Sequence, residues 1–186
     1  HFDNSKYDEK LFSFPEVLMN LESKPSGTKP TGKSSPKKGK STSGGEKALK
    51  TIKEIYKMAT NTPPNDSYNG VKIKNILADV RSYSDYKDGI DGYHLVECNF
   101  YCFDKKEKTI IMNFPFLPNN KYYLRLCFKD EDLFKKEYSR FYDTGHTGII
   151  VISGLWEKKD EEYRTKTIKA ECTIKSEKQI AIIKKK

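Results

Sequence analysis

The chain has 186 residues, a formal net charge of +9 and 33% charged residues. A chain of this length usually forms one domain with a sizeable core. It has no run of about eighteen apolar residues, which excludes an ordinary transmembrane helix, and its start does not resemble an uncleaved secretory signal. Because the chain begins with His1 and not Met, we expect that a leading segment was removed. This favours an extracytoplasmic location, in the periplasm or cell envelope, over the cytoplasm.

The excess positive charge lies in two short segments. Residues 23–45 hold six lysines and no acidic residue, and residues 184–186 are three more lysines. Without these nine lysines the chain has 26 basic and 26 acidic residues. The net charge therefore does not by itself predict a basic docking face on the folded part.

Residues 23–45 contain only Ser, Gly, Thr, Pro and Lys, which predicts a solvated linker because nothing there offsets the entropy of ordering. Within it, "SPKK" (Ser35–Lys38) is similar to basic motifs that contact the minor groove of DNA. Lys37 and Lys38 are therefore candidate nucleic-acid contacts, with a plain linker as the simpler interpretation.

An apolar segment precedes the linker, within residues 1–22. Such a segment must be buried, either against the folded domain or against a protein partner. The candidate partner-docking residues are Leu11, Phe12, Phe14, Val17 and Leu18.

The elements expected in residues 46–183 begin with a helix. Ser43 and Glu46 form a possible capping box, and helical spacing of apolar residues continues to Ala59. Two prolines, Pro63 and Pro64, end this helix. Strands are then predicted over 71–84, 93–104 and 109–116, an extended piece over 117–129, a helix over 130–142, and strands over 148–157 and 165–175.

This order predicts a mainly β fold with some α-helix, namely a five-stranded OB-fold-like Greek-key barrel. One helix precedes strand 1 and another lies between strands 3 and 4. In the last strand, alternation points Ile168, Ala170, Cys172 and Ile174 inward. Gly154 in the fourth strand suits a bend. The predicted organisation is an apolar segment (1–22), a linker (23–45), a helix plus barrel (46–183) and a basic tail (184–186).

Residues 46–175 resemble the tRNA_anti-like family of bacterial OB-fold domains. The framework residues that carry the resemblance are Tyr68 and Gly70, then Val96, Cys98 and Phe100, then Val151 or Ile152 with Gly154, and last Cys172 with Ile174. The resemblance implies an OB fold, and family members are often exported. The segment between the third and fourth strands, residues 117–147, is longer than the family pattern, which prevents the transfer of a binding site.

The four cysteines are interpreted as structural. Cys98 and Cys102 share one strand face but lie about 13 Å apart, too far for a disulfide. We expect Cys98, Cys102 and Cys172 to be core residues, while Cys127 falls opposite in phase to its apolar neighbours. A bridge from Cys98 or Cys102 to Cys172 stays open for an exported protein. The spacing predicts no metal site and no cofactor.

Catalytic motifs are missing from the sequence. His146 stands beside Asp143 in "DTGHTG", but neither a nucleophile elbow nor a Walker motif accompanies it. A turn is the simpler interpretation of this stretch. We therefore predict that the chain is not an enzyme.

Two function classes remain. The first is a non-catalytic OB-fold-like binding module that acts as an interaction or structural component of a larger assembly, with protein partners. The alternative is single-stranded nucleic-acid binding through barrel aromatics and basic loops. Its candidate residues, besides the two linker lysines, are Tyr101, Phe103, Lys105, Lys106, Lys158, Lys159 and Arg164. The competing interpretation of the two aromatic residues is an outer barrel surface covered by the inserted helix. The sequence does not define the oligomeric state.

Overall fold

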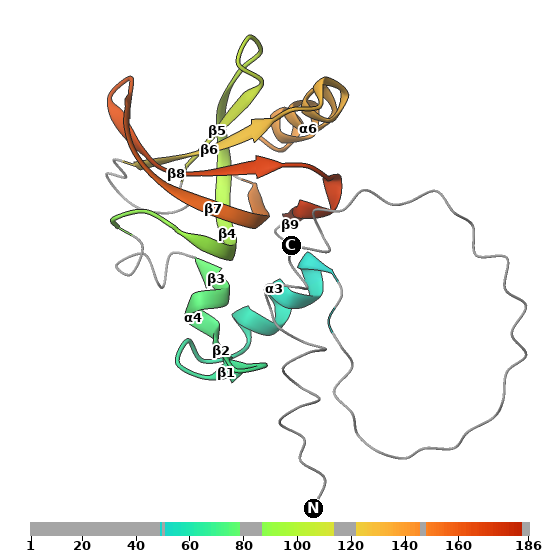
Figure 1. Ribbon diagram of the computed structural model, residues 1–186. Coiled ribbons are helices and arrows are strands. Elements are labelled where there is room, and N and C mark those ends of the chain that lie inside the picture. Colours follow the sequence, from blue (N-terminus) through green and yellow to red (C-terminus); the bar gives the residue numbers. More distant parts are fainter. Residues whose placement is uncertain (1–48, 50, 79–86, 114–121, 146–147, 184–186) are drawn as a thin grey trace, which may run out of the picture.

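The computed structural model describes residues 49, 51–78, 87–113, 122–145 and 148–183. In chain order the elements are α3 (Ile52–Thr60), β1 (Ser67–Tyr68), β2 (Val71–Lys72), α4 (Ile73–Ile76), β3 (Leu77–Ala78), β4 (Gly92–Asp104), β5 (Thr109–Asn113), β6 (Tyr122–Phe128), α6 (Glu131–Thr144), β7 (Ile149–Tyr163), β8 (Lys166–Ile174), η2 (Glu177–Gln179) and β9 (Ile180–Ile183). Figure 1 shows α3 and α4 at one end of a curved sheet and α6 beside its other end.

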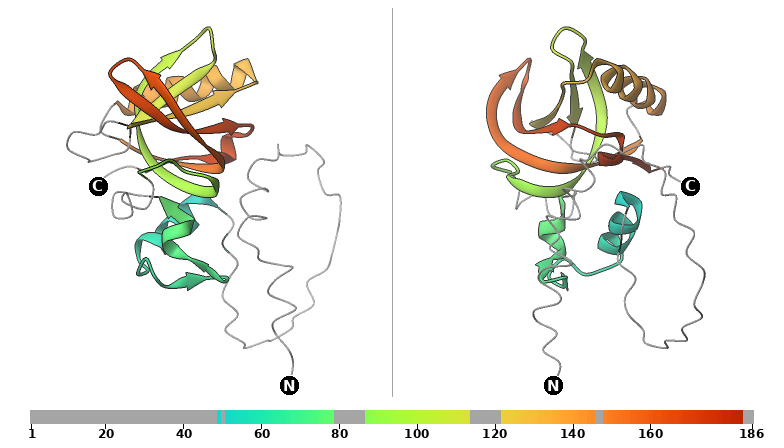
Figure 2. Two further views of the ribbon diagram at one scale, coloured as in Figure 1. Left: turned by 60° about the vertical axis from the view of Figure 1, so that its left-hand side comes forward. Right: turned by 45° about the vertical axis from the view of Figure 1, so that its right-hand side comes forward.

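Five strands close into a barrel. β4 pairs with β7 along its first half and with β5 along its second half, and the circle is completed by the pairs β5–β6, β6–β8 and β8–β7. Of the five pairings that close the barrel, only β6–β8 is parallel; outside this circle the short strand β3 also pairs with β4 in parallel. The predicted OB-fold-like barrel is confirmed, with α3 before the first barrel strand and α6 between the third and the fourth (Figures 1 and 2).

The first predicted strand, residues 71–84, is wrong over its described part. Those residues form β2, the short helix α4 and the two-residue strand β3, and the barrel begins only at β4. Ile73, Ile76 and Leu77 are all buried, and their spacing of three and four residues fits one face of a helical turn better than a strand. The extended piece predicted over 117–129 contains β6, which is the third barrel strand.

The hairpin between the last two barrel strands is longer than predicted. Residues 158–164 were expected to form a loop, but β7 continues to Tyr163 and pairs with β8 up to Lys166. Only Arg164 and Thr165 form the turn. The sequence did not predict this part of the strand, because its side chains are mostly charged and both of its faces are largely exposed beyond Trp156.

The helices pack on the barrel through narrow apolar faces. α3 has the predicted apolar face, with Ile52, Ile55 and Ala59 buried, but its capping box is Thr51 with Glu54. Residues Ser43 and Glu46 lie outside the described part. α6 is capped by Asp130, whose carboxylate accepts a hydrogen bond from the Leu133 amide at 3.0 Å. The helix predicted over 130–142 is confirmed, and Phe134 and Phe141 on one of its faces are buried in the barrel core.

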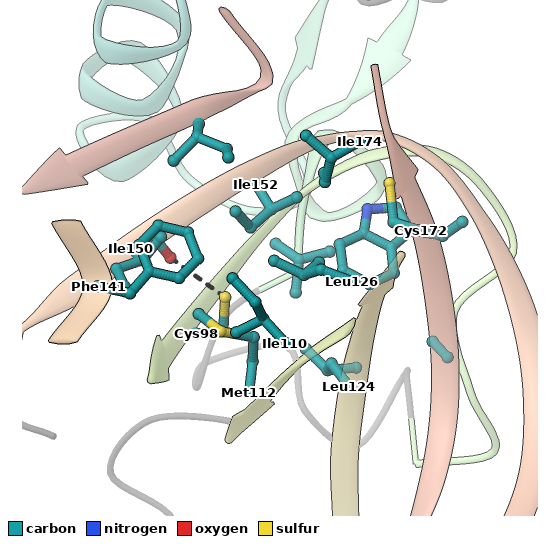
Figure 3. Packing of buried hydrophobic residues seen from close by; sticks show 14 of the residues in the cluster. Cys98, Ile110, Met112, Leu124, Leu126, Phe141, Ile150, Ile152, Cys172 and Ile174 are labelled. Atoms are coloured by element: carbon teal, nitrogen blue, oxygen red, sulfur yellow. Dashed lines mark hydrogen bonds between the residues drawn. The ribbon is translucent and has the colours of Figure 1, made fainter. Parts of the chain in front are cut away.

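The barrel interior is an apolar core (Figure 3). Cys98 and Cys172 are fully buried in it, and the Cys98 thiol lies 3.4 Å from the carbonyl oxygen of Ile150. All four cysteines are free, so the bridge to Cys172 that the sequence left open does not form. Cys102 is only half-buried and was wrongly expected in the core, because the register of β4 shifts between Phe100 and Cys102 and Cys102 packs outside the core. Among the described residues, no helix is long and apolar enough to span a membrane.

The last barrel strand is buried as predicted at Ala170, Cys172 and Ile174, but Ile168 faces a different cluster. The register between β6 and β8 shifts between Tyr123 and Leu124, so that Lys169 has no partner on β6. A bulge of this kind re-aims the residues on one side of it. Ile168 therefore packs with Ile111 and Tyr123 outside the barrel core.

Candidate binding face at the hairpin end of the barrel

A bulge in β4 separates the two aromatic residues that the sequence placed on one face. Phe100 pairs with Met112 and Cys102 with Ile111, so Tyr101 is the extra residue. Beyond the bulge, the inward–outward alternation of side chains along β4 is shifted by one residue. Phe103 therefore packs against the barrel core. Tyr101 and Cys102 instead pack against the cluster outside the barrel core that Ile111, Tyr123 and Ile168 form. The prediction of one platform built from Tyr101 and Phe103 is therefore wrong.

Three tyrosines from different strands form a tyrosine cluster on the outer face: Tyr101, Tyr123 and Tyr163. The rings of Tyr101 and Tyr123 are stacked, with centroids 4.9 Å apart and 27° between planes. The ring of Tyr163 meets Tyr123 edge-on at 5.9 Å. Tyr123 is buried, while the other two tyrosines are half-exposed. Ile111 and Ile168 complete its apolar base.

Two cations lie over these rings. The Arg164 guanidinium is 5.9 Å from the ring centroid of Tyr101 and 5.3 Å from that of Tyr163. The Lys166 ammonium is 4.9 Å from the ring centroid of Tyr123. All three distances are in the range of cation–π interactions. The two-residue turn of the β7–β8 hairpin brings both cations back over the cluster.

The tyrosine hydroxyls interact with one another and with Arg164. Hydrogen bonds with Tyr123 and then with Arg164 lower the pKa of Tyr101, because they stabilise its phenolate. Burial raises the pKa of Tyr123 and of Tyr163. The Arg164 side chain is thus held by a hydroxyl and two ring faces. None of these three groups is a carboxylate.

The other hairpin carries a second ring–cation group. Phe103 stacks on Tyr138 of α6, with centroids 4.7 Å apart, and the Lys105 ammonium lies 5.8 Å and 5.7 Å from these two rings. α6, the inserted helix, therefore covers Phe103. This is the competing interpretation that the sequence offered for this residue. Lys105 and Lys106 both lie in the β4–β5 turn, and the Asp104 carboxylate accepts a hydrogen bond from the Lys106 amide at 2.9 Å.

Other predicted site residues are not brought to this face. Lys159 forms an ion pair with Glu157 at 3.8 Å. Lys158 is exposed at the irregularity in the β7–β8 pairing. Neither is among the cations that lie over described rings. The docking residues Leu11, Phe12, Phe14, Val17 and Leu18, and the linker lysines Lys37 and Lys38, lie outside the described residues.

An ion-pair network on the same outer face was missed by sequence reasoning. Arg125 of β6 makes two hydrogen bonds to Glu161 of β7, at 3.0 and 2.8 Å, and a third at 2.6 Å to Glu171 of β8. Strand alternation places Arg125 and Glu171 outward, but their pairing depends on the parallel β6–β8 register. This guanidinium is neutralised by carboxylates, unlike Arg164.

No described residues form a group of three or more His, Cys, Asp or Glu side chains that could hold a metal ion. His94 has its two ring nitrogens 2.5 Å and 2.7 Å from the carbonyl oxygens of Asn75 and Asp91. It therefore ties the segment before the barrel to the start of β4. His146 lies outside the described residues.

No family model, curated protein or solved structure matches this chain. The resemblance to the tRNA_anti-like family stays a prediction from framework residues. The fold itself is defined by the pairing of the five barrel strands.

Proposed function

We propose that this chain is a non-catalytic OB-fold-like binding module that acts as an interaction component of a larger assembly. Its ligand contacts the hairpin end of the barrel, where the tyrosine cluster lies. The sequence-predicted docking segment, with Leu11, Phe12 and Phe14, offers a second attachment point in this proposal. In this proposal the aromatic rings at the hairpin end stack on the ligand and the cations attract it, and none of these groups has a catalytic role.

The observation that carries the proposal is the surroundings of three cations. Arg164, Lys166 and Lys105 lie over aromatic rings, and among the described residues no carboxylate is within ion-pair distance of them. Four other described cations contact carboxylates at or below 3.2 Å: Arg125, Lys135, Lys136 and Arg140. Lys169 lies over the ring of Tyr122 but is also paired with the Asp160 carboxylate at 2.9 Å. Charge that is not neutralised, set on aromatic surface, is available to a partner.

The backbone gives independent support at the same end. Arg164 at φ 56° and Lys108 at φ 51° occupy the left-handed region in the two turns. Gly or Asn fits that region at lower cost, so a long cation there calls for a reason beyond turn formation. Both hairpins project from the same end of the barrel, opposite α3 and α4 (Figures 1 and 2). The two unusual residues therefore flank one surface.

Site-specific photocrosslinking tests the proposal without assuming a ligand class. A benzophenone amino acid replaces Tyr101 in one full-length protein, and Lys57 on the exposed face of α3 in a matched control. After irradiation in extract of the source cells, we expect defined adducts from position 101 and none from position 57. Equal labelling at both positions, or none at position 101, would refute the proposed face.

A further inference from the structure

We infer that the ligand at the hairpin end is a single-stranded nucleic acid. In this arrangement Arg164 and Lys166 contact backbone phosphates, Lys105 contacts a phosphate at the other hairpin, and Tyr101 stacks on a base. The inference rests on the proposed function, because it names the ligand class of that same face.

Phosphate is the group that suits these cations. An ammonium or guanidinium over a neutral ring is held weakly at an exposed site, and a charge-assisted hydrogen bond to a phosphate oxygen is stronger. The ring contacts of Arg164 and Lys166 can therefore be exchanged for phosphate contacts. A guanidinium already bound by two carboxylates, such as that of Arg125, is poorly suited to the same exchange.

The ring of Tyr101 suits an unpaired base. One side of it rests on the buried Tyr123, and the cation near it is Arg164. When Arg164 turns to a phosphate, the half-exposed ring is free to stack. Bases of a single strand can stack on an aromatic side chain, whereas those of a duplex are already stacked on one another. This favours a single strand over a duplex.

The two hairpins define where the strand passes. The tips project from one end of the barrel (Figure 2), and each has a cation placed over rings, Lys105 on one side and Arg164 with Lys166 on the other. A strand that crosses between the tips meets positive charge on both sides of the tyrosine cluster. The lysines of residues 23–45 add long-range attraction.

Fluorescence anisotropy with labelled 15-nucleotide oligo(dT) and oligo(U), and with a 15-base-pair duplex, tests the inference on the full chain. We expect both single strands to bind more tightly than the duplex. The substitutions Tyr101→Ala, Arg164→Asn and Lys166→Gln should each weaken single-strand binding about tenfold, and Lys57→Gln should leave it unchanged. Duplex preference, or affinity indifferent to all three substitutions, would overturn the inference.

Salt dependence separates the face from the lysine-rich segment. For a single strand, each phosphate contact contributes about 0.7 to the slope of log affinity against log salt, so Arg164→Asn should lower the slope by about that amount. The variant Lys37→Gln with Lys38→Gln should bind more weakly but keep the effect of Tyr101→Ala. If the double variant abolishes binding, or if poly-glutamate competes as well as oligo(dT), the inference fails.

The unfolding free energy of Arg164→Asn keeps this inference distinct from the proposed function. Asn tolerates the left-handed conformation, so we expect the variant to be about as stable as the wild type while it loses binding. If the oligonucleotides do not bind but crosslinks still form at position 101, the nucleic-acid inference fails and the binding module remains. If Arg164→Asn is strongly destabilised and Lys166→Gln binds normally, both fail.

Discussion

At the residue scale, local surroundings decide which side chains remain available for contact or reaction. Arg164 is a side chain that we propose is available for contact, whereas Cys127 is one that is not available for reaction. It lies on the outer face of β6, yet burial raises the pKa of its thiol to about 11, with the Glu171 carboxylate as the next cause. The thiolate is the reactive form. A thiol with this pKa stays protonated at neutral pH.

Cys127 should therefore react slowly with iodoacetamide at pH 8, and its rate should rise as the pH approaches 11. The raised pKa also means that the thiol favours the folded state below about pH 9 and loses that contribution as pH rises through 11. Peptide mass spectrometry of the alkylated chain measures the rate. The variant Glu171→Gln should lower the pH at which alkylation begins; rapid alkylation of wild-type Cys127 at pH 8 would contradict the assigned surroundings.

Single extra residues explain most of the differences from the sequence predictions at this scale. Strand alternation placed Tyr101 and Phe103 together, but the bulge in β4 sends one outward and the other toward the core. The same holds for Ile168 beside the bulge in β8. A bulge adds no distinctive residue type to a sequence of alternating polar and apolar residues, so Tyr123, Tyr163 and Lys166 could not be grouped with Tyr101 in advance.

At the element scale, one buried side chain holds the short η2 helix against the barrel. Gln179 is fully buried, and its amide oxygen accepts hydrogen bonds from the backbone amides of Lys175 and Ser176 at 2.7 and 3.1 Å. Its amide nitrogen donates to the carbonyl oxygens of Ser153 and Thr173 at 3.0 and 3.2 Å. These bonds join η2 to β7 and β8.

Replacement of this amide by an apolar group of similar size should be costly. Gln179→Leu leaves several buried backbone groups without a partner, and we expect a loss of roughly 3 kcal/mol in the free energy of unfolding. Urea denaturation measures it, with exposed Lys178→Gln as the control. A change below about 1 kcal/mol would mean that the backbone groups find other partners.

Some helices and strands could be predicted from the sequence of this chain and others could not. The amphipathic helices α3 and α6 were predictable because apolar residues recur along one face of each. The short helix α4 was not, since Ile73 and Lys74 also fit the alternation of a strand. The end of β7 was not predicted either, because it lacks the apolar residues that mark a strand. Its last residues are charged, and cross-strand partners on β8, rather than burial, keep them extended.

At the scale of the whole molecule, the chain order of strands and helices predicted a five-stranded barrel, although β6 and not the segment from residue 71 supplies one of its strands. One helix between the third and fourth strands, followed by a long hairpin, fits this Greek-key arrangement. The location of the proposed binding face could not be obtained in this way. It depends on two hairpins that are distant in sequence but project from one end of the barrel.

Hydroxyl-radical footprinting of the full chain is the most direct test of that face, because it compares tyrosines within one molecule. Tyr142 on α6 is 68% exposed and lies outside the tyrosine cluster, so it serves as an internal reference. In extract of the source cells, compared with buffer, we predict that oxidation of Tyr101 and Tyr163 falls severalfold relative to Tyr142. Unchanged oxidation of Tyr101 and Tyr163 together with protection of Tyr142 would place the contact elsewhere and contradict the account.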